Sequence, residues 1–163
     1  LTPLDVNLLI QRLLSDRAAL IADRGLTLQT RLTPDLPTIP ADQAMMTQVL
    51  TNLLTNAMNY TPTGGVITLA TQLRSNSEHD WLTFSVSDTG PGISPRDRMH
   101  IFDRFYRGDA SRTAAASGTG LGLAICQEIL RRHDGQITLE SEPGHGSTFT
   151  AWLPLSLSRP HEV

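Results

Sequence analysis

The sequence has a single cysteine, no long apolar run and no excess of positive charge, and each of these absences excludes a class of protein. One cysteine among 163 residues, Cys126, rules out an internal disulfide and is compatible with a reducing compartment. No apolar run reaches the roughly 18 residues that a membrane-spanning helix needs, and we find neither a signal-peptide pattern nor a basic amphipathic anchor. The net charge of −3 lacks the excess of positive charge that is typical of nucleic-acid-binding proteins, so nucleic acid is not expected as the main partner.

The remaining composition is that of one ordinary globular domain. Hydrophobic residues make up 39% and charged residues 18% of the chain, which is long enough to bury a core. No repeat or internal boundary divides it, so we expect a single domain over residues 1–163. Because the chain begins at Leu1 rather than at methionine, we expect it to be part of a longer protein, with any membrane segment outside it.

The clearest helical pattern lies in residues 41–60. Its apolar residues recur at steps of three and four, as on one buried helix face: Ala44, Met45, Val49, Leu50, Leu53, Leu54, Ala57 and Met58. Asp42 can cap its start, and Pro62 stops it. A polar stripe has the same spacing: Gln48, Asn52, Asn56 and Asn59. Asparagine is a middling helix former, so this stripe indicates a polar site, with a solvated face as the alternative.

Elsewhere the patterns predict two more helices and several strands. The helices cover residues 5–24 and about 118–133, and the strands cover 26–32, 66–73, 81–87, 136–141 and 147–153. Residues 33–41 are predicted to be a proline-rich loop, and residues 108–117 are the best candidate for a mobile loop. This order predicts an α+β layer fold with a mixed, mostly antiparallel sheet on about three helices.

An acidic residue ends the strand predicted at 81–87. Leu82, Phe84 and Val86 alternate onto its core face, and Asp88 continues the same row. The two glycines that follow, Gly90 and Gly92, allow a sharp turn and close approach to a ligand. We therefore expect a pocket at this end of the strand.

A glycine-rich run at residues 118–123 (GTGLGL) opens the last helix. Such a turn can present backbone N–H groups to an anion, although glycines before a helix can also serve tight packing. The run lacks the Lys–Ser/Thr of P-loop enzymes and does not follow a strand in a βαβ unit. By itself it leaves both interpretations open.

Taken together, these segments resemble the ATP-binding catalytic domain of bacterial sensor histidine kinases, of the fold shared with DNA gyrase, MutL and heat-shock chaperones. Five motifs occur in the order of that family: the N box at 48–62 (QVLTNLLTNAMNYTP), the G1 box at 88–92 (DTGPG), the F box at 101–107 (IFDRFYR), the G2 box at 118–123 and a last glycine box at 144–149 (GHGSTF). The resemblance implies a two-layer α/β sandwich of the Bergerat type that binds ATP and Mg²⁺ under a mobile lid at about residues 93–117.

The resemblance also implies roles for individual residues. Asn56 corresponds to the magnesium ligand of the family, and its amide oxygen is a hard donor of the kind that Mg²⁺ accepts. Asp88 would accept a hydrogen bond from the adenine amino group, supported by the hydroxyl of Thr148. The other implied nucleotide-binding residues are Asn52, Asn59, Tyr60, Gly90, Gly92, Ile93, Gly118, Thr119, Gly120, Leu121, Gly122 and Leu123.

Arginines near the lid are the candidate cations for the phosphates. Arg104 and Arg107 are assigned with Asn56 to catalysis, and Arg112 is also near enough in sequence, with solvated lid arginines as the alternative. Many family members carry a lysine three residues after the magnesium asparagine, where this chain has Asn59. The charge lost there must come from another cation, for which Arg104 is the candidate, or the affinity is modest.

The function implied is transfer of the γ-phosphate of MgATP to a histidine of a sensor kinase, for two-component signalling to a response regulator. Related ATPases activate water with a glutamate at the position of Asn52, which cannot take a proton, so hydrolysis should be slow. The family's phosphoacceptor pattern follows none of the histidines, and we expect all of them on the surface: His79, His100, His133, His145 and His161.

The phosphoacceptor is therefore expected on a helical dimerisation domain before residue 1, in a homodimeric full-length protein. The fragment alone should bind ATP without phosphorylating itself. We expect a cytoplasmic domain that contacts neither nucleic acid nor membrane, within a protein that a membrane segment could anchor. Two alternatives stay open: a non-catalytic nucleotide-binding module, that is, a degenerate kinase, and a serine kinase of the anti-sigma type.

Overall fold

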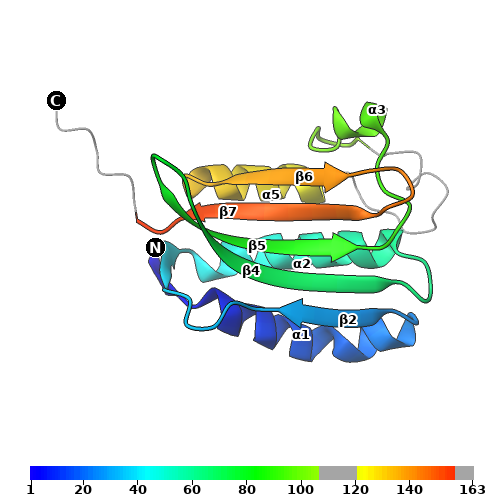
Figure 1. The fold of residues 1–163 in the computed structure, drawn as a ribbon, viewed down its shortest axis with the longest axis horizontal. Helices are drawn as coiled ribbons and strands as arrows, with labels where there is room; N and C mark the ends of the chain where they lie inside the picture. Colours follow the sequence, from blue (N-terminus) through cyan, green and yellow to red (C-terminus); the bar gives the residue numbers. More distant parts are fainter. Residues whose placement is uncertain (107–120, 157–163) are drawn as a thin grey trace.

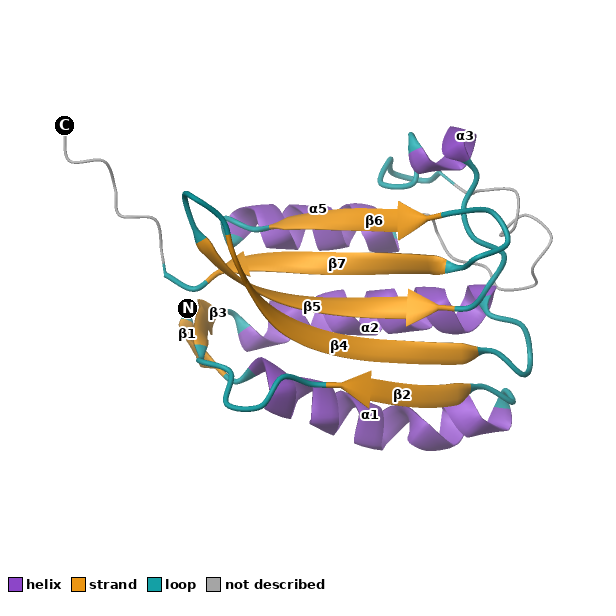
Figure 2. Ribbon diagram, in the orientation of Figure 1, coloured by secondary structure: helices purple, strands orange, loops and turns teal. Residues whose placement is uncertain are grey.

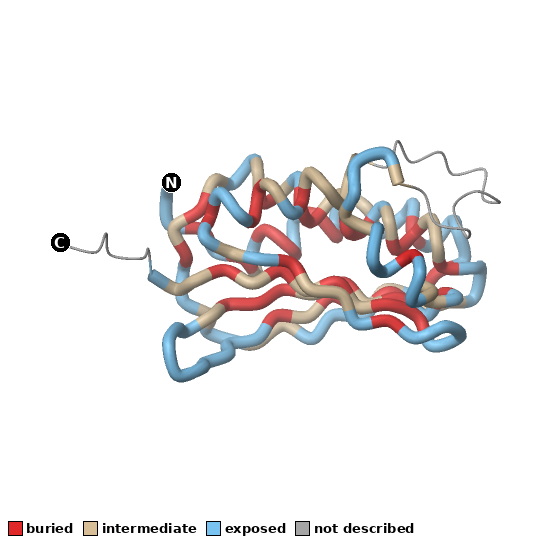
Figure 3. The backbone as a smooth tube through the Cα atoms, turned by 90° about the horizontal axis from the view of Figure 1, so that it is seen from above, coloured by how far each residue is buried: buried red, intermediate tan, exposed pale blue. Residues whose placement is uncertain are grey.

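The computed structural model describes residues 1–106 and 121–156, in which a five-stranded sheet has three long helices on one face (Figures 1 and 2). The elements in chain order are β1 (Thr2–Leu4), α1 (Val6–Asp23), β2 (Thr27–Arg31), β3 (Ile39–Ala41), α2 (Gln43–Tyr60), β4 (Val66–Ser75), β5 (Asp80–Asp88), α3 (Pro95–Arg98), α5 (Gly122–Arg132), β6 (Gln136–Ser141) and β7 (Ser147–Pro154). Figure 3 shows the two layers from above. The predicted α+β sandwich is confirmed.

The main sheet is mixed and mostly antiparallel, as predicted. Its five strands follow the order β2-β4-β5-β7-β6, and only β2 and β4 are parallel. β5 is central and pairs along its length with β4 and β7, with Asp88 opposite Ser147. A second sheet of β1 and β3 was not predicted, because β3 is only three residues long and contains a proline.

The buried face of the sheet is the alternating one that the sequence predicted. Leu82, Phe84 and Val86 of β5 are at most 1% exposed, and Asp88 continues their row at 9%. Neighbouring strands add Leu69 and Phe149 to the same core. The core therefore extends along β5 to the strand end at which the pocket was expected.

Helix α2 lies between α1 and α5 and fills the middle of the helical layer (Figure 1). The Asp42 side chain caps it by accepting a hydrogen bond from the Met45 backbone N–H at 2.9 Å. Seven residues of the helix are buried, beginning with Met46 and ending with Met58. Ala44 was predicted in this face but is exposed, because the buried stripe begins after the first turn of the helix.

Helix α5 packs against α2 through Cys126, as expected for a structural cysteine. This residue is fully buried, and burial raises the pKa of its thiol to about 12. The thiol lies 3.8 Å from the carbonyl oxygen of Val49. Cys126 therefore packs in the core as a small apolar residue and is not reactive.

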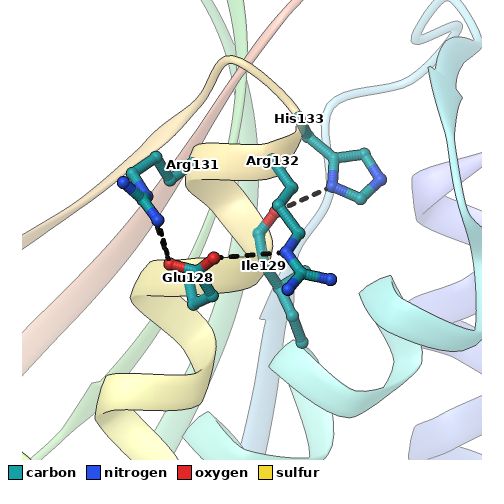
Figure 4. A network of polar contacts seen from close by, with 5 residues as sticks. All are labelled: Glu128, Ile129, Arg131, Arg132 and His133. Carbon is teal, nitrogen blue, oxygen red and sulfur yellow. Dashed lines mark hydrogen bonds and ion pairs between the residues drawn. The ribbon is translucent and has the colours of Figure 1, made fainter.

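His133, at the end of α5, is buried, so its prediction as a surface residue was wrong. Its side chain donates from Nδ1 to the Ile129 carbonyl at 2.8 Å, while Nε2 accepts from the Asp42 backbone N–H at 3.1 Å. Figure 4 shows the first of these contacts beside the exposed ion pairs of Glu128 with Arg131 and Arg132. Asp42, which donates to the His133 ring, is 91 residues away in the sequence, so no local pattern could indicate this contact.

Three other histidines lie on the surface, as predicted. His79, His100 and His145 are exposed, and His161 lies outside the described residues. Within residues 1–106 and 121–156, no helix is long and apolar enough to cross a membrane.

His133→Ala should lower the free energy of unfolding by about 1–3 kcal/mol, because it leaves two backbone groups without their partners in a buried place. Urea unfolding monitored by circular dichroism measures the change. His145→Ala, at an exposed position, is the control and should change stability little. Equal stability of the two variants would contradict a structural role for His133.

Candidate functional site

A pocket opens where the end of β5 meets the last turns of α2 and the segment 91–101. Its volume is about 470 Å³, part of it open to solvent. The lining residues are Asn56, Tyr60, Asp88, Pro91, Gly92, Ile93, Asp97, Ile101, Ser147 and Phe149. Five of the predicted site residues are thus brought together: Asn56, Tyr60, Asp88, Gly92 and Ile93.

Asp88 is the buried carboxylate of this pocket. Its Oδ1 accepts a hydrogen bond from the Gly90 backbone N–H at 2.9 Å, and the Ser147 backbone also donates to the carboxylate. Burial raises the pKa of Asp88 above its usual value, and these two hydrogen bonds oppose the rise. The side chain thus keeps a hydrogen-bond acceptor in a largely apolar setting.

Two glycines let the segments around Asp88 approach one another. A Cβ on Gly90 would lie 2.6 Å from the carbonyl oxygen of Tyr60, closer than side chains come. Gly146 has a φ of +79° and lies against the Asp88 carbonyl. Both positions therefore require glycine for packing, while contact of Gly90 and Gly92 with a nucleotide stays a prediction.

Thr148 does not support Asp88, contrary to the prediction. Its hydroxyl lies 2.8 Å from the Ser87 hydroxyl, and the two residues are directly opposite on β7 and β5. Side chains alternate along a strand, so Thr148 faces away from the side that Asp88 faces. Ser147, which the sequence reasoning missed, lines the pocket instead. The one-residue strand register decides between them, and a sequence alone does not fix it.

The asparagines in the polar stripe of α2 are half-buried, whereas Gln48 is exposed, and the three asparagines have different contacts. Asn56 faces the pocket. Asn52 donates from Nδ2 to the Gly122 carbonyl at 3.2 Å, which attaches α2 to the start of α5. Asn59 accepts at Oδ1 from Arg24 Nη1, also at 3.2 Å. The partner Arg24 was not among the predicted site residues.

The segment 91–106 forms one wall of the pocket and is attached to the edge strand β6. The Ile93 backbone N–H donates to the Ser141 hydroxyl at 2.7 Å. The Arg98 guanidinium donates to the carbonyls of Leu139 and Ser141 at 3.1 and 3.0 Å. Residues 93–98, at the start of the predicted lid, therefore have fixed contacts in this structure.

The F box continues this wall. Tyr106 donates from its hydroxyl to Asp97 at 2.5 Å, and the Phe102 ring packs edge-on against Phe149 at 6.2 Å between centroids. Phe105, by contrast, is 70% exposed. Asp97 and Phe149 both line the pocket, so these contacts attach the F box to its wall.

A second hollow lies between α2 and α5. Its lining residues are Met45, Gln48, Arg104, Leu121, Ala124, Ile125, Glu128, Ile129 and Arg132. Arg104 and Leu121 therefore line this hollow and not the pocket of Asp88, whereas Leu123 packs against the core. Gly122 begins α5 beside Asn52. The remaining predicted residues, Arg107, Arg112, Gly118, Thr119 and Gly120, lie outside the described residues.

Metal binding by protein groups alone is not supported in the described part of the chain. No cluster of three or more histidine, cysteine, aspartate or glutamate side chains occurs there. Asn56, the predicted magnesium ligand, offers one amide oxygen at the pocket. This donor set fits an ion that takes most of its ligands from phosphate and water.

A sandwich of this kind, with a buried aspartate at the end of a central strand beside an asparagine-bearing helix, defines a class of ATP-binding domains. The family model for histidine kinase-, DNA gyrase B- and HSP90-like ATPases matches residues 41–157. The chain belongs to this family.

Its relatives include sensor histidine kinases. The chain is 40% identical over 147 residues to the adaptive-response sensory kinase SasA of Microcystis aeruginosa, covering 90% of this chain and 37% of SasA. It is 33% identical over 162 residues to the sensor-like histidine kinase SenX3 of Mycobacterium bovis, covering 99% of this chain and 38% of SenX3. The chain thus spans less than two fifths of these relatives.

Solved structures of histidine kinases share the fold. The nucleotide-free catalytic domain of histidine kinase ThkA superposes with a TM-score of 0.79 at 26% identity, covering 94% of this chain and 97% of that one. Full-length ShkA, in complex with AMPPNP, gives a TM-score of 0.80 at 28% identity, covering 98% of this chain and 32% of ShkA.

Asp88→Asn should leave the free energy of unfolding unchanged at pH 7 or raise it. A raised pKa means that the folded state binds more protons than the unfolded state between the usual aspartate pKa of 3.8 and the raised value. The wild-type carboxyl therefore loses stability as pH rises through that window, and the amide does not. Urea unfolding at a series of pH values measures the difference between the two proteins.

As the pH rises, the free energy of unfolding of Asp88→Asn should increase relative to that of the wild type. Asp80→Asn, at the exposed opposite end of β5, controls for the loss of one negative charge. A difference that is constant with pH, or that grows as pH falls, would contradict the assignment.

Proposed function

We propose that the chain binds MgATP and donates its γ-phosphate to a histidine on a separate dimerisation domain of a sensor kinase. The observation that carries this proposal is Asp88, a buried acceptor in a pocket that also has apolar lining residues. Adenine is a flat ring with an amino donor at its edge. Ile93, Ile101 and Phe149 provide apolar contacts for such a ring, and Asp88 provides the acceptor.

In this proposal, Asn56 of α2 lies at the metal end of the nucleotide. It lies one helical turn before Tyr60 and lines the same pocket. An amide oxygen there could complete the coordination of a Mg²⁺ ion that is held mainly by phosphate oxygens and water. When bound, the ion would neutralise the charge that develops on the transferred phosphoryl group.

Transfer to a supplied imidazole is favoured over hydrolysis. Helix α2 contains no aspartate or glutamate that could activate water. Asn52, which occupies the position of the glutamate in the related ATPases, donates its amide to Gly122. Phosphoryl transfer depends mainly on positioning and charge neutralisation, so a domain without a base can carry it out when the nucleophile is delivered.

The acceptor is expected outside this chain. His133 has both ring nitrogens in hydrogen bonds and is 5% exposed, so it cannot meet a γ-phosphate. The naming of the relatives as sensory and sensor-like kinases supports an acceptor on dimerisation helices of a homodimer. A response regulator would then receive the phosphoryl group.

Calorimetric titration should show saturable ATP binding that Mg²⁺ strengthens. Asp88→Asn should weaken it about tenfold to a hundredfold, because a buried hydrogen bond is lost. The Gly90 N–H holds the oxygen of the new amide, which turns its NH₂ group toward the adenine amino donor. Asp80→Asn should bind as the wild type does.

Two results would overturn this part of the proposal. Wild-type affinity in Asp88→Asn would exclude the carboxylate from adenine recognition. Absence of saturable binding at millimolar ATP would show that this chain is not a nucleotide-binding domain, or is a degenerate one.

Incubation with MgATP labelled in the γ-phosphate should leave the chain unlabelled and release phosphate slowly. The measurement is the label retained after separation under alkaline conditions, which preserve phosphohistidine, together with the phosphate set free. Label on this chain would contradict an external acceptor. Rapid phosphate release, abolished in Asp88→Asn, would instead indicate an ATPase.

A further inference from the structure

The pocket lacks a cation among its described lining residues, although the proposed ligand is a polyanion. The only charged groups among these described residues are the carboxyls of Asp88 and Asp97. Arg104, the cation expected to compensate for Asn59, lines the separate hollow between α2 and α5. A triphosphate held beside two carboxyls needs positive charge from another element.

Helix α1 supplies a cation to this side of α2. Arg24 follows the last residue of α1, and its Nη1 donates to Asn59 Oδ1 at 3.2 Å. Asn59 lies three residues after Asn56 and directly before Tyr60, both of which line the pocket. The guanidinium is therefore attached to the helix turn that carries the proposed magnesium ligand.

The backbone around Arg24 is bonded to the turn between α2 and β4. The Arg24 carbonyl accepts from the Thr63 hydroxyl at 3.4 Å, and the Gly25 carbonyl accepts from the Gly64 N–H at 2.8 Å. The same turn continues into Val66, whose N–H donates to the Thr89 hydroxyl at 2.9 Å, next to Asp88. Hydrogen bonds therefore hold the backbone at Arg24 in place near the site, although the Arg24 side chain is exposed.

The chemistry of the pair suits an anion. A guanidinium carries only donors, so its partner atom on Asn59 must be the amide oxygen. The NH₂ group of Asn59 is then the part of the amide that can donate to a phosphate. Arg24 adds a planar set of N–H donors and a full positive charge, which an amide alone lacks.

We propose that Arg24, positioned by Asn59, is a phosphate-binding residue of the nucleotide site and supplies the positive charge that residue 59 itself does not carry. This inference rests on the proposed function, since it requires that the pocket bind a nucleotide. The alternative role for Arg24 is structural, because a cation also stabilises the carbonyl ends of α1 and α2. The structural role affects stability, whereas phosphate binding affects affinity for phosphorylated ligands.

The test compares ATP with adenosine as calorimetric ligands of this chain. Arg24→Gln should weaken ATP binding about threefold to tenfold, as expected for a charged pair at an exposed position, and should leave adenosine binding unchanged. Arg24→Lys keeps the charge and should retain most of the affinity for ATP. Arg12→Gln removes the same charge from an exposed position of α1 and should behave as the wild type.

A second variant gives a rescue. Asn59→Lys, combined with Arg24→Gln, places an ammonium group on the same turn of α2 and should restore ATP affinity to within about twofold of the wild type. The same double variant should not change adenosine affinity. Urea unfolding of each variant checks that the differences in affinity do not follow stability.

The outcomes separate this inference from the proposed function. If the wild type binds ATP and Arg24→Gln binds it equally well, the inference fails and the proposed function stands. Equal losses for ATP and adenosine, or losses that follow the unfolding free energy, assign Arg24 a structural role and also overturn the inference. If the wild type binds neither ligand, both proposals fail.

Discussion

The structure depends on one constraint: α2 must bury an apolar face completely and still present polar groups along its flank. The buried face, from Met46 to Met58, makes the helix the centre of the helical layer. The polar groups then become its connections, because a half-buried amide needs partners. Asn52 bonds the start of α5, and Asn59 bonds Arg24 at the end of α1. With Asn56 in the pocket, the same helix connects the candidate site to the end of α1 and the start of α5.

The carboxylate of Asp88 is desolvated because it lies at the end of a core strand. Three apolar residues precede it in the same buried row, so the carboxylate is desolvated, and its raised pKa measures how unfavourable the charged form has become. Two backbone donors offset part of this cost without removing the acceptor from the pocket. A residue chosen for stability alone would be apolar here. An aspartate here leaves an acceptor at the pocket, as the proposed recognition of the adenine amino group requires.

Local patterns in the sequence predicted the long helices and the buried face of β5, because both depend on residue spacing within one segment. The 3.6-residue period gave α1, α2 and α5, and strand alternation placed Asp88 on the core face beside a pocket. Contacts between distant segments could not be predicted in this way. The partners of His133 and Asn59 are 91 and 35 residues away. The choice between Ser147 and Thr148 depends on the register of β7 against β5, which a shift of one residue would reverse.

The asparagine at position 52 links the fold to the type of reaction. Its NH₂ group donates to the carbonyl of Gly122, which is the first residue of α5 and part of the glycine-rich run at 118–123. A glutamate in its place carries no donor when ionised, and its charge would repel that carbonyl. The position can therefore hold either a base that activates water or this link between α2 and α5, but not both. The chain has the link, which supports the proposed transfer to a nucleophile from another domain over activation of water.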